Sequence, residues 1–157
     1  NFLVPRGATG TVQIALSVPT GKAELVADFT QIAAALFCYG AANRRWVAAT
    51  HPDGVLVSRA GLVGGSGFRP AAPGQAVSLY GTGFGPIEGG SSTGPLKQRV
   101  MVRIGGADSN VTYAGLVSPG LYQINVIVPD VPDGDHAVEV ETGGRGIISD
   151  ALVPVKR

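Results

Sequence analysis

The sequence YQINVIV at residues 122–128 decides the fold class of this chain. Every second residue in it is apolar, from Tyr122 to Val128, and side chains on a β-strand point to opposite faces at alternate positions. Similar stretches occur at residues 12–18, 77–79, 100–104 and 138–140, with glycine, proline or aspartate between them. The pattern predicts an all-β chain, with six strands between residues 73 and 157.

An internal repeat relates the two ends of the chain. Asn1-Phe2-Leu3-Val4-Pro5 matches Asn125-Val126-Ile127-Val128-Pro129, and Gly10, Ile14 and Leu16 match Gly134, Val138 and Val140, at a constant offset of 124 residues. The repeat predicts that residues 1–29 are the C-terminal strands of a truncated immunoglobulin-like β-sandwich, and that residues 73–157 form a nearly complete sandwich of that kind. Residues 30–72 are predicted to be a connector that carries a β-hairpin.

The truncated repeat raises the question of what covers it. The chain begins at Asn1 without an initiator methionine or a signal peptide, so we expect a processed or excised piece. Strands with one apolar face and unpaired edges are marginal alone, and the cover could be residues 30–72, the chain's own sandwich, or strands of a neighbouring molecule. The candidate interface residues are Asn1, Phe2, Leu3, Val4, Val12, Ile14, Leu16 and Val18.

Two segments of the connector have local signals. Residues 46–49 and 55–57 flank the sequence His-Pro-Asp-Gly at residues 51–54, which suits a type I turn and predicts the β-hairpin. Residues 30–39 are rich in alanine and end at Gly40, so a short helix and an extended segment both stay open there.

Composition excludes several classes of partner. Charged residues are only 15% of the chain, against about 25% in an average domain, and no basic run is denser than Arg44-Arg45, so we expect no nucleic-acid binding. The longest apolar stretch, residues 32–42, is well short of the ~20 residues of a membrane-spanning helix, so we expect no membrane insertion. The single cysteine, Cys38, excludes an internal disulfide and leaves a buried thiol or an interchain disulfide.

Residues that could carry chemistry are few. Gly81, Gly83 and Gly85 follow a strand as in a dinucleotide-binding loop, but a glycine- and serine-rich tail follows them in place of a helix, which favours a bulge and loop. The two histidines, His51 and His136, lie far apart in sequence. We therefore predict no enzyme, no catalytic or metal-binding residues and no cofactor.

Two weaker ligand sites stay open. The loop from Asp130 to Asp135 offers three carboxylates, which could bind calcium or form a solvated turn. Trp46 and Tyr39 could contribute to an aromatic platform for a sugar, although packing in the core or the hairpin is the better interpretation.

Several motifs in the C-terminal half carry a family resemblance. They are RPAAPG at residues 69–74, VSLYGTGFGP at 77–86, VRIGG at 102–106, YAGL at 113–116 and GLYQINV at 120–126. In this order they resemble the Solibacter-type C-terminal domain, an uncharacterised immunoglobulin-like module of exported bacterial proteins. The likeness covers about residues 69–155, departs from the family at Gly143-Gly144-Arg145-Gly146, and implies a secreted or cell-surface location without implying an activity.

These observations predict a non-enzymatic extracellular structural or interaction module. Its expected partners are copies of itself or neighbouring immunoglobulin-like repeats, joined head to tail by strand complementation at the incomplete N-terminal repeat. The alternative function is a carbohydrate-binding accessory module of a larger exported protein.

Overall fold

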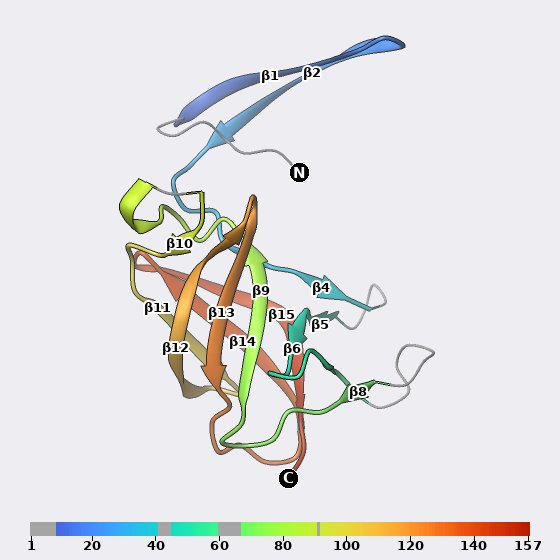
Figure 1. Cartoon of the computed structure of the whole chain (residues 1–157), viewed down its shortest axis with the longest axis vertical. Coiled ribbons are helices and arrows are strands. Elements are labelled where there is room, and N and C mark those ends of the chain that lie inside the picture. The colour runs from blue at the N-terminus through green and yellow to red at the C-terminus, as the bar shows by residue number, and fades with distance from the viewer. Residues whose placement is uncertain (1–8, 41–44, 60–66, 91) are drawn as a thin grey trace.

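The computed structural model describes residues 9–40, 45–59, 67–90 and 92–157, and the elements keep the labels of Figure 1. Two long strands come first, β1 (Gly10–Val18) and β2 (Gly21–Phe29). Six short ones follow: β3 (Ala35–Leu36), β4 (Cys38–Tyr39), β5 (Arg45–Val47), β6 (Ala49–Thr50), β7 (Leu56–Val57) and β8 (Phe68–Arg69). The remainder are β9 (Ala76–Thr82), η1 (Glu88–Gly90), β10 (Gly94–Pro95), β11 (Val100–Ile104), β12 (Ala107–Ser118), β13 (Leu121–Ile127), β14 (Gly134–Thr142) and β15 (Arg145–Val155).

The strands form two separate sheets of very different size. β1 and β2 pair only with each other, while the other strands form one mixed sheet in the order β4-β5-β15-β14-β11-β12-β13-β9-β6-β7-β8. β10 lies beside β12, and β3 lies beside β9. The larger sheet curls strongly into a half-barrel (Figure 1). The predicted all-β class is confirmed, but in place of the predicted pair of sheets the structure shows one continuous curled sheet.

The sheet is continuous because β12 changes partners along its length. Its first residues pair with β11, from Ile104↔Ala107 to Val102↔Ser109, and from Asn110 onward it pairs with β13. A register shift between Val111 and Tyr113 accompanies this change. One long strand thus joins the two halves of the sheet, and such irregularities bend and twist a strand.

The core lies inside the curl, where alternate residues of the long strands meet. β9 buries Val77 and Leu79, and β13 buries Ile124 and Val126. These positions follow the period-two pattern of the sequence. The other fully buried large side chains include Phe84, Val102, Ile104, Val128 and Val138.

The predicted connector is built into the larger sheet through its short strands. β3 pairs with β9, β5 pairs in parallel with β15, and β6 pairs with β9. β6 and β7 form the predicted hairpin, in which the His51 amide donates to the Val55 carbonyl at 2.8 Å. Residues 30–39 contain no helix, and their regular structure consists of the short strands β3 and β4.

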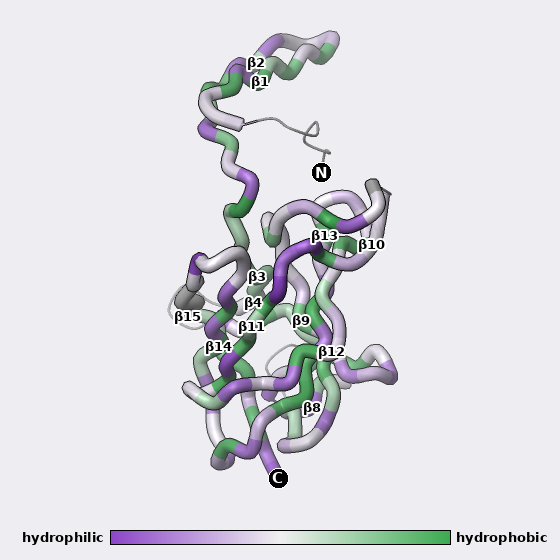
Figure 2. Tube along the Cα trace, turned by 90° about the vertical axis from the view of Figure 1, so that its left-hand side faces the viewer, coloured by the Kyte–Doolittle hydropathy of each residue, from purple (hydrophilic) through white to green (hydrophobic). Residues whose placement is uncertain are grey.

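The N-terminal hairpin leaves the larger sheet at a close backbone contact. The Ala33 amide donates to the Gly83 carbonyl at 3.0 Å. Gly83 has a φ of +73°, and a Cβ there would lie only 2.1 Å from the Ala33 carbonyl oxygen. This close backbone approach accounts for a glycine at position 83 without a role in nucleotide binding. Beyond it, β1 and β2 extend away from the curled sheet (Figures 1 and 2). Nowhere in the described ranges is there a helix long and apolar enough to cross a membrane.

Candidate interaction surface

The hairpin β1–β2 separates apolar from polar side chains. Residues directly opposite one another share a face of an antiparallel pair, as Ile14↔Leu25 and Leu16↔Ala23 do here. One face of the hairpin, called the apolar face below, consists of Val12, Ile14, Leu16, Val18, Ala23, Leu25, Ala27 and Phe29. The alternation is visible along the top of Figure 2. This face includes four of the predicted interface residues, whereas Asn1 to Val4 lie outside the described residues.

The opposite face of the hairpin is mostly polar. The Thr11 hydroxyl donates to the Asp28 carboxylate at 2.7 Å, and the Gln13 amide donates to the Glu24 carboxylate at 3.0 Å. Val26 is the one large apolar residue on this side, and it is 64% exposed. The polar face therefore suits contact with water, as the outer face of a half-buried sheet does.

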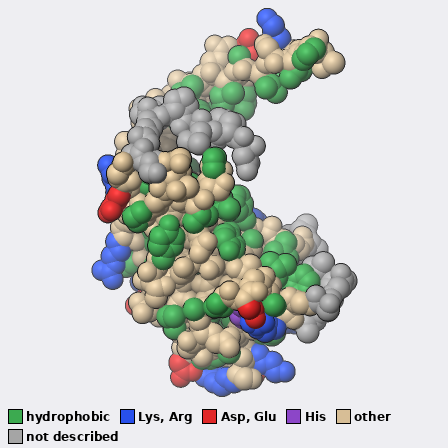
Figure 3. Space-filling view, viewed as in Figure 1, with side chains coloured by type: hydrophobic (Ala, Val, Ile, Leu, Met, Phe, Trp, Pro, Cys, Tyr) green, Lys and Arg blue, Asp and Glu red, His purple; other side chains and the backbone are tan. Residues whose placement is uncertain are grey.

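The part of the apolar face nearest the turn is equally open to water, whereas Val12, Ile14, Ala27 and Phe29 are half-buried. Leu16 is 62% exposed, Leu25 is 61% exposed and Val18 is 48% exposed. Figure 3 shows hydrophobic side chains on the side of the hairpin that faces the rest of the molecule, across a hollow, and charged ones on the far side. Contiguous exposed apolar surface of this kind marks interaction sites in soluble proteins.

The repeat found in the sequence is also a repeat of structure. With the offset of 124 residues, β1 (10–18) falls on β14 (134–142), and the first residue of β2 falls on the first residue of β15. The four residue pairs nearest the turn correspond, from Val18↔Gly21 and Thr142↔Arg145 to Ala15↔Glu24 and Glu139↔Ile148. Farther from the turn they differ, because β14–β15 has a register shift between Ala137 and Glu139 and β1–β2 has none.

The equivalent positions differ sharply in burial. Val138, Val140 and Thr142 of β14 are 0%, 3% and 0% exposed. Their counterparts by the offset of 124 residues are Ile14, Leu16 and Val18. The same kind of strand is therefore part of the core at one end of the chain, while at the other end Ile14 is half-buried and Leu16 and Val18 are exposed.

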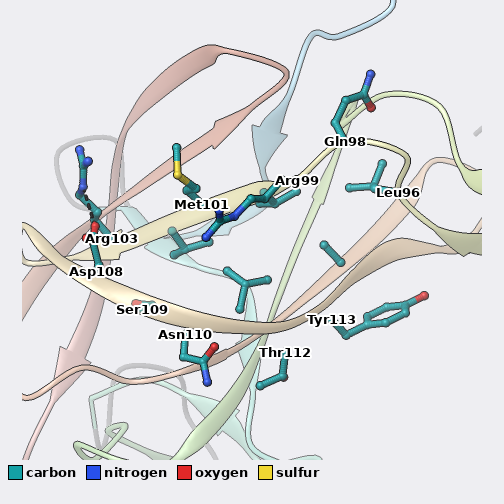
Figure 4. Close-up of a pocket in the computed structure, with 14 residues that line it drawn as sticks. Leu96, Gln98, Arg99, Met101, Arg103, Asp108, Ser109, Asn110, Thr112 and Tyr113 are labelled. Atoms are coloured by element: carbon teal, nitrogen blue, oxygen red, sulfur yellow. Dashed lines mark hydrogen bonds and ion pairs between the residues drawn. The ribbon is translucent and has the colours of Figure 1, made fainter.

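A groove lies between β11 and β12. It opens where the two strands part, has a volume of about 610 Å³, and is lined on its rim by Arg99, Asn110, Thr112 and Tyr113 (Figure 4). The Ser109 hydroxyl and the Gln98 side-chain oxygen line it too and, among the described residues, have no hydrogen-bond partner.

A charged pair lies at one end of this groove. The Arg103 Nε donates to the Asp108 carboxylate at 2.9 Å, and the guanidinium lies 3.9 Å from Glu139. The hydrogen bond to Asp108 raises the pKa of Arg103. Because these groups are exposed, their ion pairs contribute little to stability.

The two histidines and the acidic residues of the 130–135 loop are not among the residues that line the groove. The His51 ring lies 3.2 Å from the Arg69 carbonyl oxygen, and the His136 ring lies 2.7 Å from the Pro132 carbonyl oxygen. Each histidine ring therefore contacts a backbone carbonyl group. Asp130 and Asp133 both pair with Arg157, and Asp135 pairs with Arg59. Within the described ranges, no cluster of three acidic, histidine or cysteine side chains is placed to hold a metal ion.

The proposed aromatic platform for a sugar is wrong, because Trp46 packs inside the protein. Its side chain is 1% exposed, and the Arg59 guanidinium lies 5.6 Å from its ring centre. The Tyr39 hydroxyl donates to the Val57 carbonyl at 2.5 Å. The Cys38 thiol is half-buried and donates to the Leu36 carbonyl at 3.6 Å. Both aromatic side chains therefore pack within the protein, which is the interpretation that the sequence favoured.

Sequence reasoning found the hairpin but missed the groove. The alternation at residues 12–18 was sufficient to indicate an apolar face. The groove depends on the parting of β11 and β12, which no local pattern encodes. Comparison with known proteins gives no matching family model, no similar curated protein and no similar solved structure.

Proposed function

We propose that this chain is a non-enzymatic structural module that joins other β-modules head to tail, by strand complementation at hairpin β1–β2. The observation that carries the proposal is the exposed apolar face, with Leu16 62% and Leu25 61% exposed beside a polar face made of hydrogen-bonded side chains. Burying a large aliphatic side chain contributes about 1.5–3 kcal/mol, so a cover over this face is strongly favoured.

An immunoglobulin-like relationship and an exported location belong to the same proposal. The sheet half with β11, β14 and β15 and the half with β9, β12 and β13 both contribute side chains to one core. Two layers around one core are the arrangement of an immunoglobulin-like sandwich. The resemblance to the Solibacter-type C-terminal domain supports a secreted or cell-surface location.

The test compares two adjacent residues on opposite faces of the hairpin. Leu25 and Val26 are 61% and 64% exposed, so Leu25→Ser and Val26→Ser change similar amounts of exposed apolar surface. We expect the native chain to associate with increasing concentration in sedimentation velocity. We expect Leu25→Ser to weaken that association about tenfold, because the exposed part of one leucine is worth about 1.5 kcal/mol.

The matched variant decides what the result means. Val26→Ser should associate as the native chain does, because its side chain lies on the polar face. Equal losses in both variants, or a native chain that stays monomeric at every concentration, would contradict self-assembly through the apolar face.

A second candidate function, carbohydrate binding, is favoured by the groove between β11 and β12. Its volume of about 610 Å³ lies in the range of small-molecule sites, and Asn110, Thr112 and Tyr113 give it a polar rim. The exposed polar side chains of Asn110 and Thr112 could hydrogen-bond to sugar hydroxyls. A glycan array with the native chain and with Asn110→Ala tests this function, and no signal that depends on Asn110 would remove it.

A further inference from the structure

The surroundings of β14–β15 specify what a closing hairpin of this fold contacts. β11 runs antiparallel along the outer edge of β14, with Val100↔Thr142, Val102↔Val140 and Ile104↔Val138. β5 runs parallel to the outer edge of β15, at Ala151 and Leu152. The inward side chains of β14 are covered by the opposite half of the curled sheet. A closing hairpin of this fold is thus paired on both edges and covered on one face.

The hairpin β1–β2 has the features of a closing hairpin, but within the described ranges neither of its outer edges is paired with another strand. Among the described residues its strands pair only with each other. The inward residues of β14 correspond to Ile14, Leu16 and Val18, which are apolar and as large as or larger than Val138, Val140 and Thr142. The hairpin is therefore at least as well suited as β14–β15 to face an apolar core.

We propose that the partner of β1–β2 is a curled sheet of this same fold that lacks its own closing hairpin and is carried on another polypeptide segment. The inference rests on the proposed function and names its partner. A second copy of this chain could cover the apolar face, but it does not offer the closing position in a curled sheet, because its own β14–β15 fills that position.

The equivalence also specifies the pairing that such a partner makes. Its edge strand runs antiparallel to β1 and has apolar residues at alternate positions, as β11 has Val100, Val102 and Ile104. By the offset of 124 residues, these positions stand opposite Val18, Leu16 and Ile14. Strand addition of this kind gains backbone hydrogen bonds along the edge and buries alternate side chains.

The experiment supplies the missing sheet within an extended chain. Residue 125 corresponds to residue 1, so residues 35–124 are added directly before Asn1 of the intact chain. The added segment then leads into β1–β2, as the same segment leads into β14–β15 in the native chain. The extension has the sequence from β3 to the first four residues of β13, and Asn1, Phe2 and Leu3 follow in place of Asn125, Val126 and Ile127. From residue 125 onward, the native sequence is replaced by the sequence that starts at Asn1 and includes the hairpin β1–β2.

Hydrogen exchange of the hairpin amides gives the answer. We expect amides of β1 and β2 to become as protected as those of β14 and β15, because opening them then requires unfolding the new sheet. The extended chain should also no longer associate through the apolar face. Hairpin amides that exchange as fast as in the native chain, including the case in which the extension stays unfolded, would overturn the proposal.

Two variants of the extended chain separate closure from general stabilisation. Leu16→Ser with Leu25→Ser places polar groups in the new core and should abolish the protection, whereas Val26→Ser should leave it intact. Protection that survives the double variant would also overturn the proposal.

The exchange experiment on the extended chain and the association test of the proposed function can fail independently. A native chain that self-associates through Leu25, combined with an unprotected hairpin in the extended chain, would keep the interaction surface and reject a partner of the same fold. A monomeric native chain with a protected hairpin in the extended chain would reject self-assembly and keep the partner proposed here.

Discussion

Replacing Val140 by alanine and, separately, Leu16 by alanine compares two positions that the repeat makes equivalent. Val140 is 3% exposed in the core, and Leu16 is 62% exposed on the hairpin. Val140→Ala removes two buried carbons, worth about 1.6 kcal/mol in transfer free energy, and leaves a cavity, so we expect a loss of about 2–3 kcal/mol.

The same reasoning gives a much smaller effect at the hairpin. Leu16→Ala removes three carbons that are only about one-third buried, which is worth roughly 1 kcal/mol at most. Since the hairpin pairs with no strand of the larger sheet in the part of the chain that the structure describes, this loss should not reach the unfolding of that sheet. We expect its free energy of unfolding to change by less than about 0.5 kcal/mol.

Denaturant unfolding followed by the fluorescence of Trp46 measures this difference. Trp46 is 1% exposed, and its strand pairs with β15, so its signal reports the larger sheet. The protein should be dilute, so that association does not add to stability. A loss of about 2 kcal/mol for Leu16→Ala would mean that the chain covers its own hairpin, and would refute the reasoning.

The remaining predictions concern the hairpin root and the buried tyrosines. Gly83→Ala should destabilise the protein by at least about 1 kcal/mol more than Gly74→Ala in thermal unfolding, because both glycines have positive φ but only Gly83 would press a Cβ against Ala33. Burial raises the pKa of Tyr39 and of Tyr122 above the ordinary 10.0, so both should ionise late in an ultraviolet titration. The stability that these phenols contribute is present below pH 10.0 and is lost as the pH rises through their folded pKa values. Denaturant unfolding measured at a series of alkaline pH values should therefore show a free energy of unfolding that falls as the pH rises.

The strands and the repeat could be predicted because they depend on local patterns. Alternation identifies which side chains share a face, as at residues 12–18 and 122–128, and the offset of 124 residues predicted a hairpin that the structure contains. The predicted turn at residues 51–54 also forms, because its Pro-Asp-Gly sequence is a local signal.

The single curled sheet could not be predicted in this way. Alternation along β12 gives the face of each residue, but it does not specify that the strand leaves β11 and joins β13 at Asn110. The short strands β3 to β8 form because of neighbours far along the chain. Ala35, in an alanine-rich stretch compatible with a helix, is extended because it pairs with Thr82 of β9. The groove between β11 and β12 is a consequence of the same long-range arrangement.

Hydrogen exchange of the native chain, compared between β1 and β14, tests the central claim most directly. The two hairpins have corresponding pairing near their turns, so a difference in protection reflects what covers them and not their own hydrogen bonds. In dilute protein we predict that β1–β2 amides exchange far faster than β14–β15 amides, and that raising the protein concentration slows the exchange of β1–β2 alone. Equal protection of β1 and β14 in dilute protein would contradict the claim that the apolar face awaits strands from another segment.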